Sequence, residues 1–259
     1  MKPKTLNLYK QAIAASFSKV ANSYDNFAFI EQEIGNRLLQ RLEYINIKPQ
    51  YILDLGCGSG YLSNRLQQLF PNATIIGLDL SFEMVKFASL NSKLKYCCAD
   101  AESLPFSDQK FDLIFSSCCI PFIKDLESLY TELQRVLTID GLLLFTTFGP
   151  DTLKELSLEL NHTDMHHIGD LLLHKQYKNP VVDTEKIIFT YKKLHTLLHD
   201  LQGSGSFEID FNSSENTHLP CQATFEVIYG HAQKQAVKPK QFTDTCGNTY
   251  IPITELQIL

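Results

Sequence analysis

The sequence has no tryptophan, and its only arginines are Arg37, Arg41, Arg65 and Arg135. Lysine and arginine together number 23 against 29 aspartates and glutamates, so the formal net charge is −6. No run of basic residues stands out along the chain. Because nucleic-acid phosphates are bound by clustered lysines and arginines, this composition argues against a nucleic-acid partner.

Long hydrophobic runs are also missing. No window approaches the roughly 18 apolar residues of a membrane span, and residues 1–30 lack the pattern of a signal peptide. The hydrophobic share of 44% and the charged share of 20% are typical of an ordinary globular protein. We therefore predict a cytoplasmic protein with no membrane partner, and we expect a monomer.

Seven cysteines are present, an odd number that predicts reduced thiols in a chain without an export signal. The adjacent pairs Cys97-Cys98 and Cys118-Cys119 lack the Cys-x-x-Cys spacing of zinc sites, and we interpret them as small apolar residues in strands. His195 and His199 lie four apart on a predicted helix, with no evident third ligand. We predict no metal site.

Hydrophobic periodicity predicts helices that alternate with strands. The predicted helices span residues 6–20, 29–45, 61–70, 82–89, 126–137, 151–160, 168–175 and 192–201. The predicted strands span residues 51–55, 73–80, 94–99, 111–116, 142–148, 181–191 and 223–230. Turns are predicted at Asp140-Gly141 and in the polar stretch 202–218, and Ser81 is placed to cap a helix. This alternation predicts an α/β fold, with a mostly parallel sheet covered by helices on both faces.

We divide the chain into four predicted segments. Residues 1–48 form an N-terminal helical cap, and residues 49–149 form the cofactor-binding core. Residues 150–232 supply lid helices and the last strands of the same domain, and residues 233–259 form a polar C-terminal tail.

A glycine-rich turn, Asp54-Leu-Gly-Cys-Gly-Ser-Gly60, lies between a predicted strand and a predicted helix. Its glycines allow a sharp turn and the close approach of a ligand, and the following helix presents free N–H groups. The Gly-x-Gly-x-Gly spacing differs from the Gly-x-Gly-x-x-Gly of dinucleotide-binding folds. The Asp54 carboxylate would repel a pyrophosphate but attract the cationic amino end of S-adenosylmethionine. We predict an S-adenosylmethionine site that includes Asp54, Gly56, Cys57, Gly58 and Gly60.

Two more acidic residues end the next predicted strands. Asp79 can accept hydrogen bonds from both ribose hydroxyls. Asp100, which is followed by Ala101, can accept a hydrogen bond from the amino group of adenine. Ligands of such sheets bind outside the carboxyl ends of the strands. Each feature alone is also typical of an ordinary turn, a helix cap or a solvated charge, but their shared spacing and strand context favour a cofactor site.

These segments resemble the class I S-adenosylmethionine-dependent methyltransferases. The resemblance rests on Tyr51-Ile-Leu-Asp-Leu-Gly-Cys-Gly-Ser-Gly60, Gly77-Leu-Asp-Leu-Ser81, Asp100-Ala-Glu-Ser-Leu-Pro-Phe106 and Phe111-Asp-Leu-Ile114. It implies a Rossmann-like fold with a seven-stranded sheet, N-terminal helices and a helical lid insertion. It also implies cofactor contacts at Leu80 and Ser116.

Other segments resemble the malonyl-[acyl-carrier protein] O-methyltransferases of biotin synthesis, over residues 9–232. They are Phe17-Ser-Lys-Val-Ala-Asn-Ser-Tyr-Asp25, Phe145-Thr-Thr-Phe-Gly-Pro-Asp-Thr-Leu-Lys-Glu-Leu156, Asp170-Leu-Leu-Leu-His174, Pro180-Val-Val-Asp183 and Thr224-Phe-Glu-Val-Ile-Tyr-Gly-His-Ala232. The resemblance implies methylation of the free carboxylate of a malonyl group on acyl-carrier protein or coenzyme A. Tyr24 is our candidate catalytic residue, in contact with cofactor and substrate; its alternative is a packing tyrosine.

Three segments depart from that family. The family usually has an Asn…Gln-Trp pattern where this chain has Ser116-Ser-Cys-Cys-Ile-Pro-Phe-Ile123, a loop that we expect to face the methyl acceptor. Lys19 stands where the family has an arginine. Residues 201–220 are short where the family has an additional helix.

Three alternatives stay open at this point. The chain could methylate another carboxylate or small molecule, or it could be a descendant without catalytic activity. The segment Phe148-Gly-Pro-Asp-Thr-Leu153 is also similar to an arginine-hydroxylating assembly factor of respiratory complex I.

Overall fold

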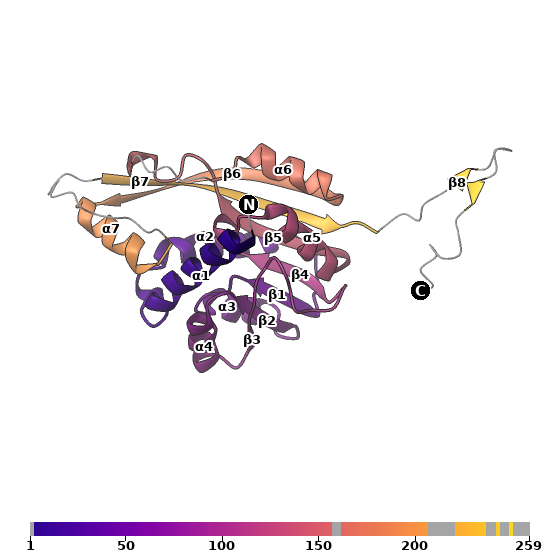
Figure 1. The fold of residues 1–259 in the computed structure, drawn as a ribbon, viewed down its shortest axis with the longest axis horizontal. Coiled ribbons are helices and arrows are strands. Elements are labelled where there is room, and N and C mark those ends of the chain that lie inside the picture. The colour runs from indigo at the N-terminus through magenta and orange to yellow at the C-terminus, as the bar shows by residue number, and fades with distance from the viewer. Residues whose placement is uncertain (1–2, 157–161, 207–220, 237–241, 244–248, 251–259) are drawn as a thin grey trace.

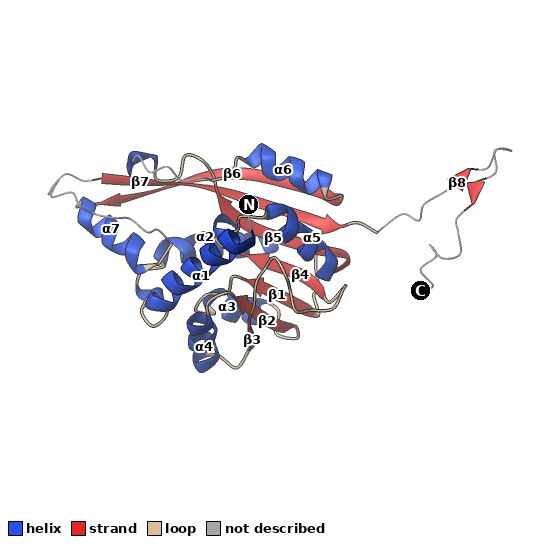
Figure 2. Cartoon of the chain, viewed as in Figure 1, coloured by secondary structure: helices blue, strands red, loops and turns tan. Residues whose placement is uncertain are grey.

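A computed structural model of the chain describes residues 3–156, 162–206, 221–236, 242–243 and 249–250. Within these residues, seven strands form one sheet in the order β3-β2-β1-β4-β5-β7-β6, seen in Figure 2 as a series from β3 at the bottom of the view to β6 and β7 at the top. The strands are β1 (Tyr51–Leu55), β2 (Thr74–Asp79), β3 (Lys95–Cys98), β4 (Phe111–Ser116), β5 (Leu137–Phe148), β6 (Tyr177–Tyr191) and β7 (Cys221–Lys234). A separate antiparallel pair joins β8 (Phe242–Thr243) and β9 (Thr249–Tyr250).

The strands β1 to β5 run parallel, while β7 runs antiparallel to both β5 and β6. Figure 1 shows β6 and β7 as two long strands along one edge of the molecule. This arrangement confirms the predicted seven-stranded, mostly parallel sheet. A parallel sheet buries both faces, which explains why Ile52, Leu53 and Leu55 form an almost continuous apolar run in β1.

Helices cover both faces of the sheet. They are α1 (Pro3–Val20), α2 (Phe29–Leu42), α3 (Tyr61–Leu69), α4 (Phe82–Asn91), α5 (Leu126–Val136), α6 (Met165–His174) and α7 (Leu194–Gly203), with the short 3-10 helices η1 (Tyr24–Asn26), η2 (Ile120–Phe122) and η3 (Lys154–Leu156). Side chains of α2, α3 and α7 share one hydrophobic cluster with Ile52, whereas side chains of α5 and α6 share another with Leu53. Since neighbouring residues of a strand point to opposite faces, the two clusters lie on opposite sides of the sheet.

Local signals in the sequence set several helix ends. Ser81 precedes α4, and its Oγ accepts a hydrogen bond from Met84 N at 3.3 Å, so the predicted cap is confirmed. Asp125 caps α5 in the same way, through Ser128 N at 3.0 Å.

None of the helices in the described part of the chain has the length and hydrophobicity of a membrane-spanning segment.

Two predicted elements differ from the structure. The predicted helix over 151–160 is wrong as far as it is described, because residues 151–156 form turns and η3 and residues 157–161 lie outside the described part. The turn at Asp140-Gly141 is not a strand boundary but an irregularity inside β5, where Asp140 has a φ of 60° and the pairing with β4 shifts. In the predicted turn region 202–218, residues 207–218 lie outside the described residues.

Candidate active site at the carboxyl end of the sheet

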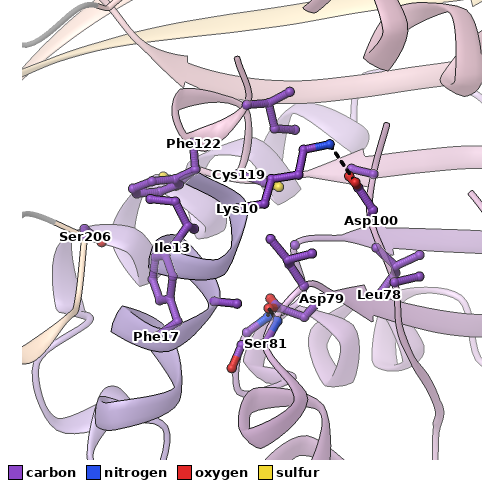
Figure 3. Close-up of a pocket in the computed structure, with 18 of the residues that line it drawn as sticks. Lys10, Ile13, Phe17, Leu78, Asp79, Ser81, Asp100, Cys119, Phe122 and Ser206 are labelled. Atoms are coloured by element: carbon purple, nitrogen blue, oxygen red, sulfur yellow. Dashed lines mark hydrogen bonds and ion pairs between the residues drawn. The ribbon is translucent and has the colours of Figure 1, made fainter. Parts of the chain in front are cut away.

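A cavity of about 820 Å³, partly open to solvent, lies where β1, β2 and β4 end. Figure 3 shows Ile13 and Phe17 of α1 on one side of the cavity and Leu78 and Asp79 of β2 on the other. The first helix of the chain therefore forms one wall of a site whose other wall is the sheet.

The glycine-rich turn after β1 lies at this cavity, with Gly56 and Gly58 on its wall. Gly56, Gly58 and Gly60 have φ angles of 74°, 51° and 82°, a left-handed conformation that favours glycine. Gly60 is also the N-cap residue of α3. The backbone of the turn is held to β2, because Gly56 N and Cys57 N both donate to Leu78 O at 2.7 and 2.9 Å.

Asp79 joins the glycine-rich turn to the start of α4. Its Oδ2 accepts a hydrogen bond from Gly58 N at 2.9 Å, and its Oδ1 accepts one from Ser81 N at 2.8 Å. Burial raises the pKa of this carboxyl, and the backbone hydrogen bonds oppose that shift. Asp79 and its neighbour Leu80 both line the cavity.

Asp100 and Ala101 line the cavity beyond β3, and Asp100 is ion-paired with a residue that the sequence did not single out. Lys10 Nζ lies 2.6 Å from Asp100 Oδ2 and 2.6 Å from Glu102 Oε2. Burial would lower the pKa of Lys10, but the hydrogen bonds to the two carboxylates outweigh it and raise the pKa. Lys10 and Asp100 are 90 residues apart in the sequence, so no local sequence pattern predicts their contact.

Four of the predicted cofactor residues do not line the cavity in this structure. Asp54 is only 1% exposed, and its Oδ2 accepts a hydrogen bond from Ser63 Oγ at 2.5 Å. Burial raises the pKa of Asp54 to about 7. Ser116 is fully buried, with its Oγ donating to Leu55 O. Cys57 and Gly60 belong to the glycine-rich turn but do not line the cavity.

Tyr24, in η1, lies on the cavity wall beside the glycine-rich turn. Its Cε1 would be 3.7 Å from a Cβ added to Gly58. Burial raises the pKa of Tyr24 well above its usual value, and the nearby charge of Glu31 adds to the shift. Glu31, from the first turn of α2, also lines the cavity, although sequence reasoning placed it only on a helix.

The loop after β4 supplies the next part of the wall, through Ser117, Cys118, Cys119 and Phe122. The interpretation of Cys118 and Cys119 as strand residues was wrong, since β4 ends at Ser116 and Cys118 has a φ of 55°. Burial raises the pKa of Cys118 to about 12 and that of Cys119 further. Both thiols are therefore protonated at neutral pH and are poor nucleophiles.

The cavity wall carries more negative than positive side chains. Its only cation within the described residues is Lys10, and its carboxylates are Glu31, Asp79, Asp100 and Glu102. A cationic ligand would gain favourable electrostatic energy in such a site. The described residues contain no cluster of three or more histidine, cysteine, aspartate or glutamate side chains that could hold a metal ion.

The sequence of the chain is similar to those of known methyltransferases. Residues 53–145 match a family model described as a methyltransferase domain. A malonyl-[acyl-carrier protein] O-methyltransferase of Legionella pneumophila is 36% identical, over 94% of this chain and 96% of that protein. A malonyl-[acyl-carrier protein] O-methyltransferase 1 of Coxiella burnetii is 35% identical, over 89% of this chain and 90% of its own length.

Solved structures agree with the fold. A methyltransferase of Thermotoga maritima, described as dependent on S-adenosylmethionine, has a TM-score of 0.58 at 18% identity and covers 86% of this chain and 100% of its own. A phosphoethanolamine N-methyltransferase of Haemonchus contortus, solved with S-adenosylmethionine, has a TM-score of 0.55 at 19% identity and covers 78% of this chain and 53% of its own. The predicted Rossmann-like class I methyltransferase fold is confirmed.

Proposed function

Because this chain belongs to the family of malonyl-[acyl-carrier protein] O-methyltransferases, we propose that it methylates the free carboxylate of a malonyl group. The methyl donor is S-adenosylmethionine, and the acceptor is malonyl-[acyl-carrier protein] or malonyl-CoA. The product is a methyl ester for biotin synthesis. The curated relatives do not favour the alternative of an arginine-hydroxylating assembly factor.

The observation that carries this proposal is the position of Asp79 on the cavity wall, bonded through Oδ2 to the backbone of the glycine-rich turn. We assign Asp79 to the ribose hydroxyls, Leu80 and Ala101 to the sides of the adenosine, and Asp100 to the adenine amino group. The excess of carboxylates on the cavity wall supports a cationic methyl donor. Asp54, which is buried behind the turn, is assigned to holding Ser63 and the turn in place.

The reaction does not require the chain to transfer a proton. The donor supplies a methyl group already activated on a positively charged sulfur. A malonyl carboxylate is already an anion at neutral pH, so one O–C bond forms, one S–C bond breaks, and no proton moves. The remaining task of the protein is to orient the carboxylate and to remove water from it.

We assign that task to aromatic residues that line the cavity. Tyr24 lies beside Gly58, and Phe17 packs edge-on against Phe122 with ring centroids 5.1 Å apart. Together they form part of the apolar wall of the cavity, between α1 and the loop after β4. Tyr24 is the residue that we propose contacts both cofactor and acceptor.

The proposal is tested by complementation. A biotin-requiring bacterial strain that lacks its own malonyl-carrier methyltransferase should grow without biotin when it expresses this chain. The Asp79→Ala variant, made at an equal level, should not restore growth. Failure of the unaltered chain to restore growth, despite soluble expression, would contradict the proposed acceptor.

A further inference from the structure

Glu31 places a carboxylate oxygen without a partner at the cavity. Its Oε1 accepts a hydrogen bond from Ser206 Oγ at 2.7 Å. Its Oε2 is buried and has no hydrogen-bond partner among the described residues. Leaving such an oxygen unsatisfied destabilises the protein, and more so if the group is charged, so an unpaired group on a cavity wall points to a ligand that completes it.

The position of Glu31 can be related to the proposed adenosine site. Figure 3 shows Ser206 and Asp100 at opposite ends of the cavity, and Glu31 is bonded to Ser206. Tyr24 lines the same cavity beside Gly58, and the charges of both Glu31 and Asp79 raise its pKa, so both carboxylates are near it. A cofactor with its adenine at Asp100 and its ribose at Asp79 would therefore extend toward Glu31.

We propose that Glu31 Oε2 accepts a hydrogen bond from the α-ammonium group in the methionine part of S-adenosylmethionine. This inference rests on the proposed function, since it takes the adenosine position from it. Asp54, the residue that the sequence favoured for this contact, is 1% exposed and already bonded to Ser63. Glu31 lines the cavity and is bonded to Ser206, which Figure 3 shows at the end opposite Asp100.

Two ligands separate this contact from the rest of the site. S-adenosylhomocysteine carries the α-ammonium group, whereas 5′-deoxy-5′-methylthioadenosine has the same adenosine and no amino-acid part. By titration calorimetry, Glu31→Gln should raise the Kd for S-adenosylhomocysteine at least about tenfold and leave the Kd for the shorter ligand within about twofold. Ser206→Ala should produce a smaller loss of the same kind.

Glu33→Gln is the matched control, because Glu33 lies on the same helix and pairs with Arg37 at the surface; it should change neither Kd. An unchanged or lower Kd for S-adenosylhomocysteine in Glu31→Gln would overturn the inference, and so would an equal loss for both ligands. If the unaltered chain bound neither ligand, the proposed function itself would fail.

Discussion

Lys10 Nζ, on the first helix, lies 2.6 Å from Asp100 Oδ2, the carboxylate that we assign to adenine. The same ammonium lies 2.6 Å from Glu102 Oε2, and the side chain of Glu102 is only 7% exposed. One residue of α1 thus forms ion pairs with two carboxylates that follow β3. This contact connects the helix that covers the cavity to the wall that it covers.

We expect Lys10→Met to destabilise the folded chain by about 1–3 kcal/mol, because it leaves the carboxylate of Glu102 buried without a counterion. The measurement is urea unfolding without cofactor. Lys86→Met is the control, since Lys86 and Glu83 form an exposed pair, and such pairs contribute about 0–1 kcal/mol. Equal losses in the two variants would show that Lys10 does not hold α1 in place.

The buried carboxyl of Asp54 should make stability depend on pH. Its pKa is raised to about 7 in the folded chain from 3.8, so the folded state binds more protons than the unfolded state between these values. The contribution is present at low pH and is lost as the pH rises through about 7. Between pH 5 and pH 8 the unaltered chain should lose about 2–3 kcal/mol more than Asp54→Asn. Parallel stability profiles of the two proteins, measured without cofactor, would refute the raised pKa.

Asp79 should contribute strongly to cofactor affinity. We expect Asp79→Ala to weaken S-adenosylhomocysteine binding by about 1–3 kcal/mol, because it removes the hydrogen bonds to ribose and releases Gly58 N. Glu83→Gln, a change at an exposed residue of α4, serves as the control in the same calorimetric experiment. An unchanged affinity in Asp79→Ala would mean that the ribose site is misplaced.

The glycines of the turn should differ in their tolerance of alanine. A Cβ at Gly56 would overlap Cys119, whereas a Cβ at Gly58 would lie 3.7 Å from Tyr24. Both positions have positive φ angles, so both variants carry backbone strain. We expect Gly56→Ala to lower the midpoint of thermal unfolding clearly more than Gly58→Ala. A larger loss for Gly58→Ala would contradict the close packing of Gly56 against Cys119.

Local patterns predicted the parts of this molecule that depend on local chemistry. The apolar strands, the glycine-rich turn, the cap at Ser81 and the position of Asp79 all follow from spacing within a few residues. The ion pair of Lys10 with Asp100 and the hydrogen bond between Glu31 and Ser206 join segments 90 and 175 residues apart. Nothing in the sequence near Lys10 or Glu31 distinguishes them from other polar residues of an amphipathic helix.

The burial of Asp54 has a similar explanation. Its place at the end of β1 was predicted, but its side chain turns toward Ser63 of α3 and away from the cavity wall. A strand pattern predicts which side chains share a face of the sheet, but it does not predict which residues those side chains contact. The helix predicted over 151–160 failed for a related reason, because Leu153 N is bonded to Thr224 O and Glu155 accepts from the side chain of Thr224, contacts supplied by β7.

The methyl acceptor that we propose is the carboxylate of a carrier-bound malonyl group. The most direct measurement incubates the purified chain with S-adenosylmethionine labelled in its methyl group and with malonyl-[acyl-carrier protein]. Acetyl-[acyl-carrier protein], which lacks the free carboxylate, is the matched acceptor control. We expect label on the malonyl carrier, released as methanol by mild base, and none on the acetyl carrier. No label on the malonyl carrier, with S-adenosylmethionine bound by the same preparation, would contradict the proposed reaction.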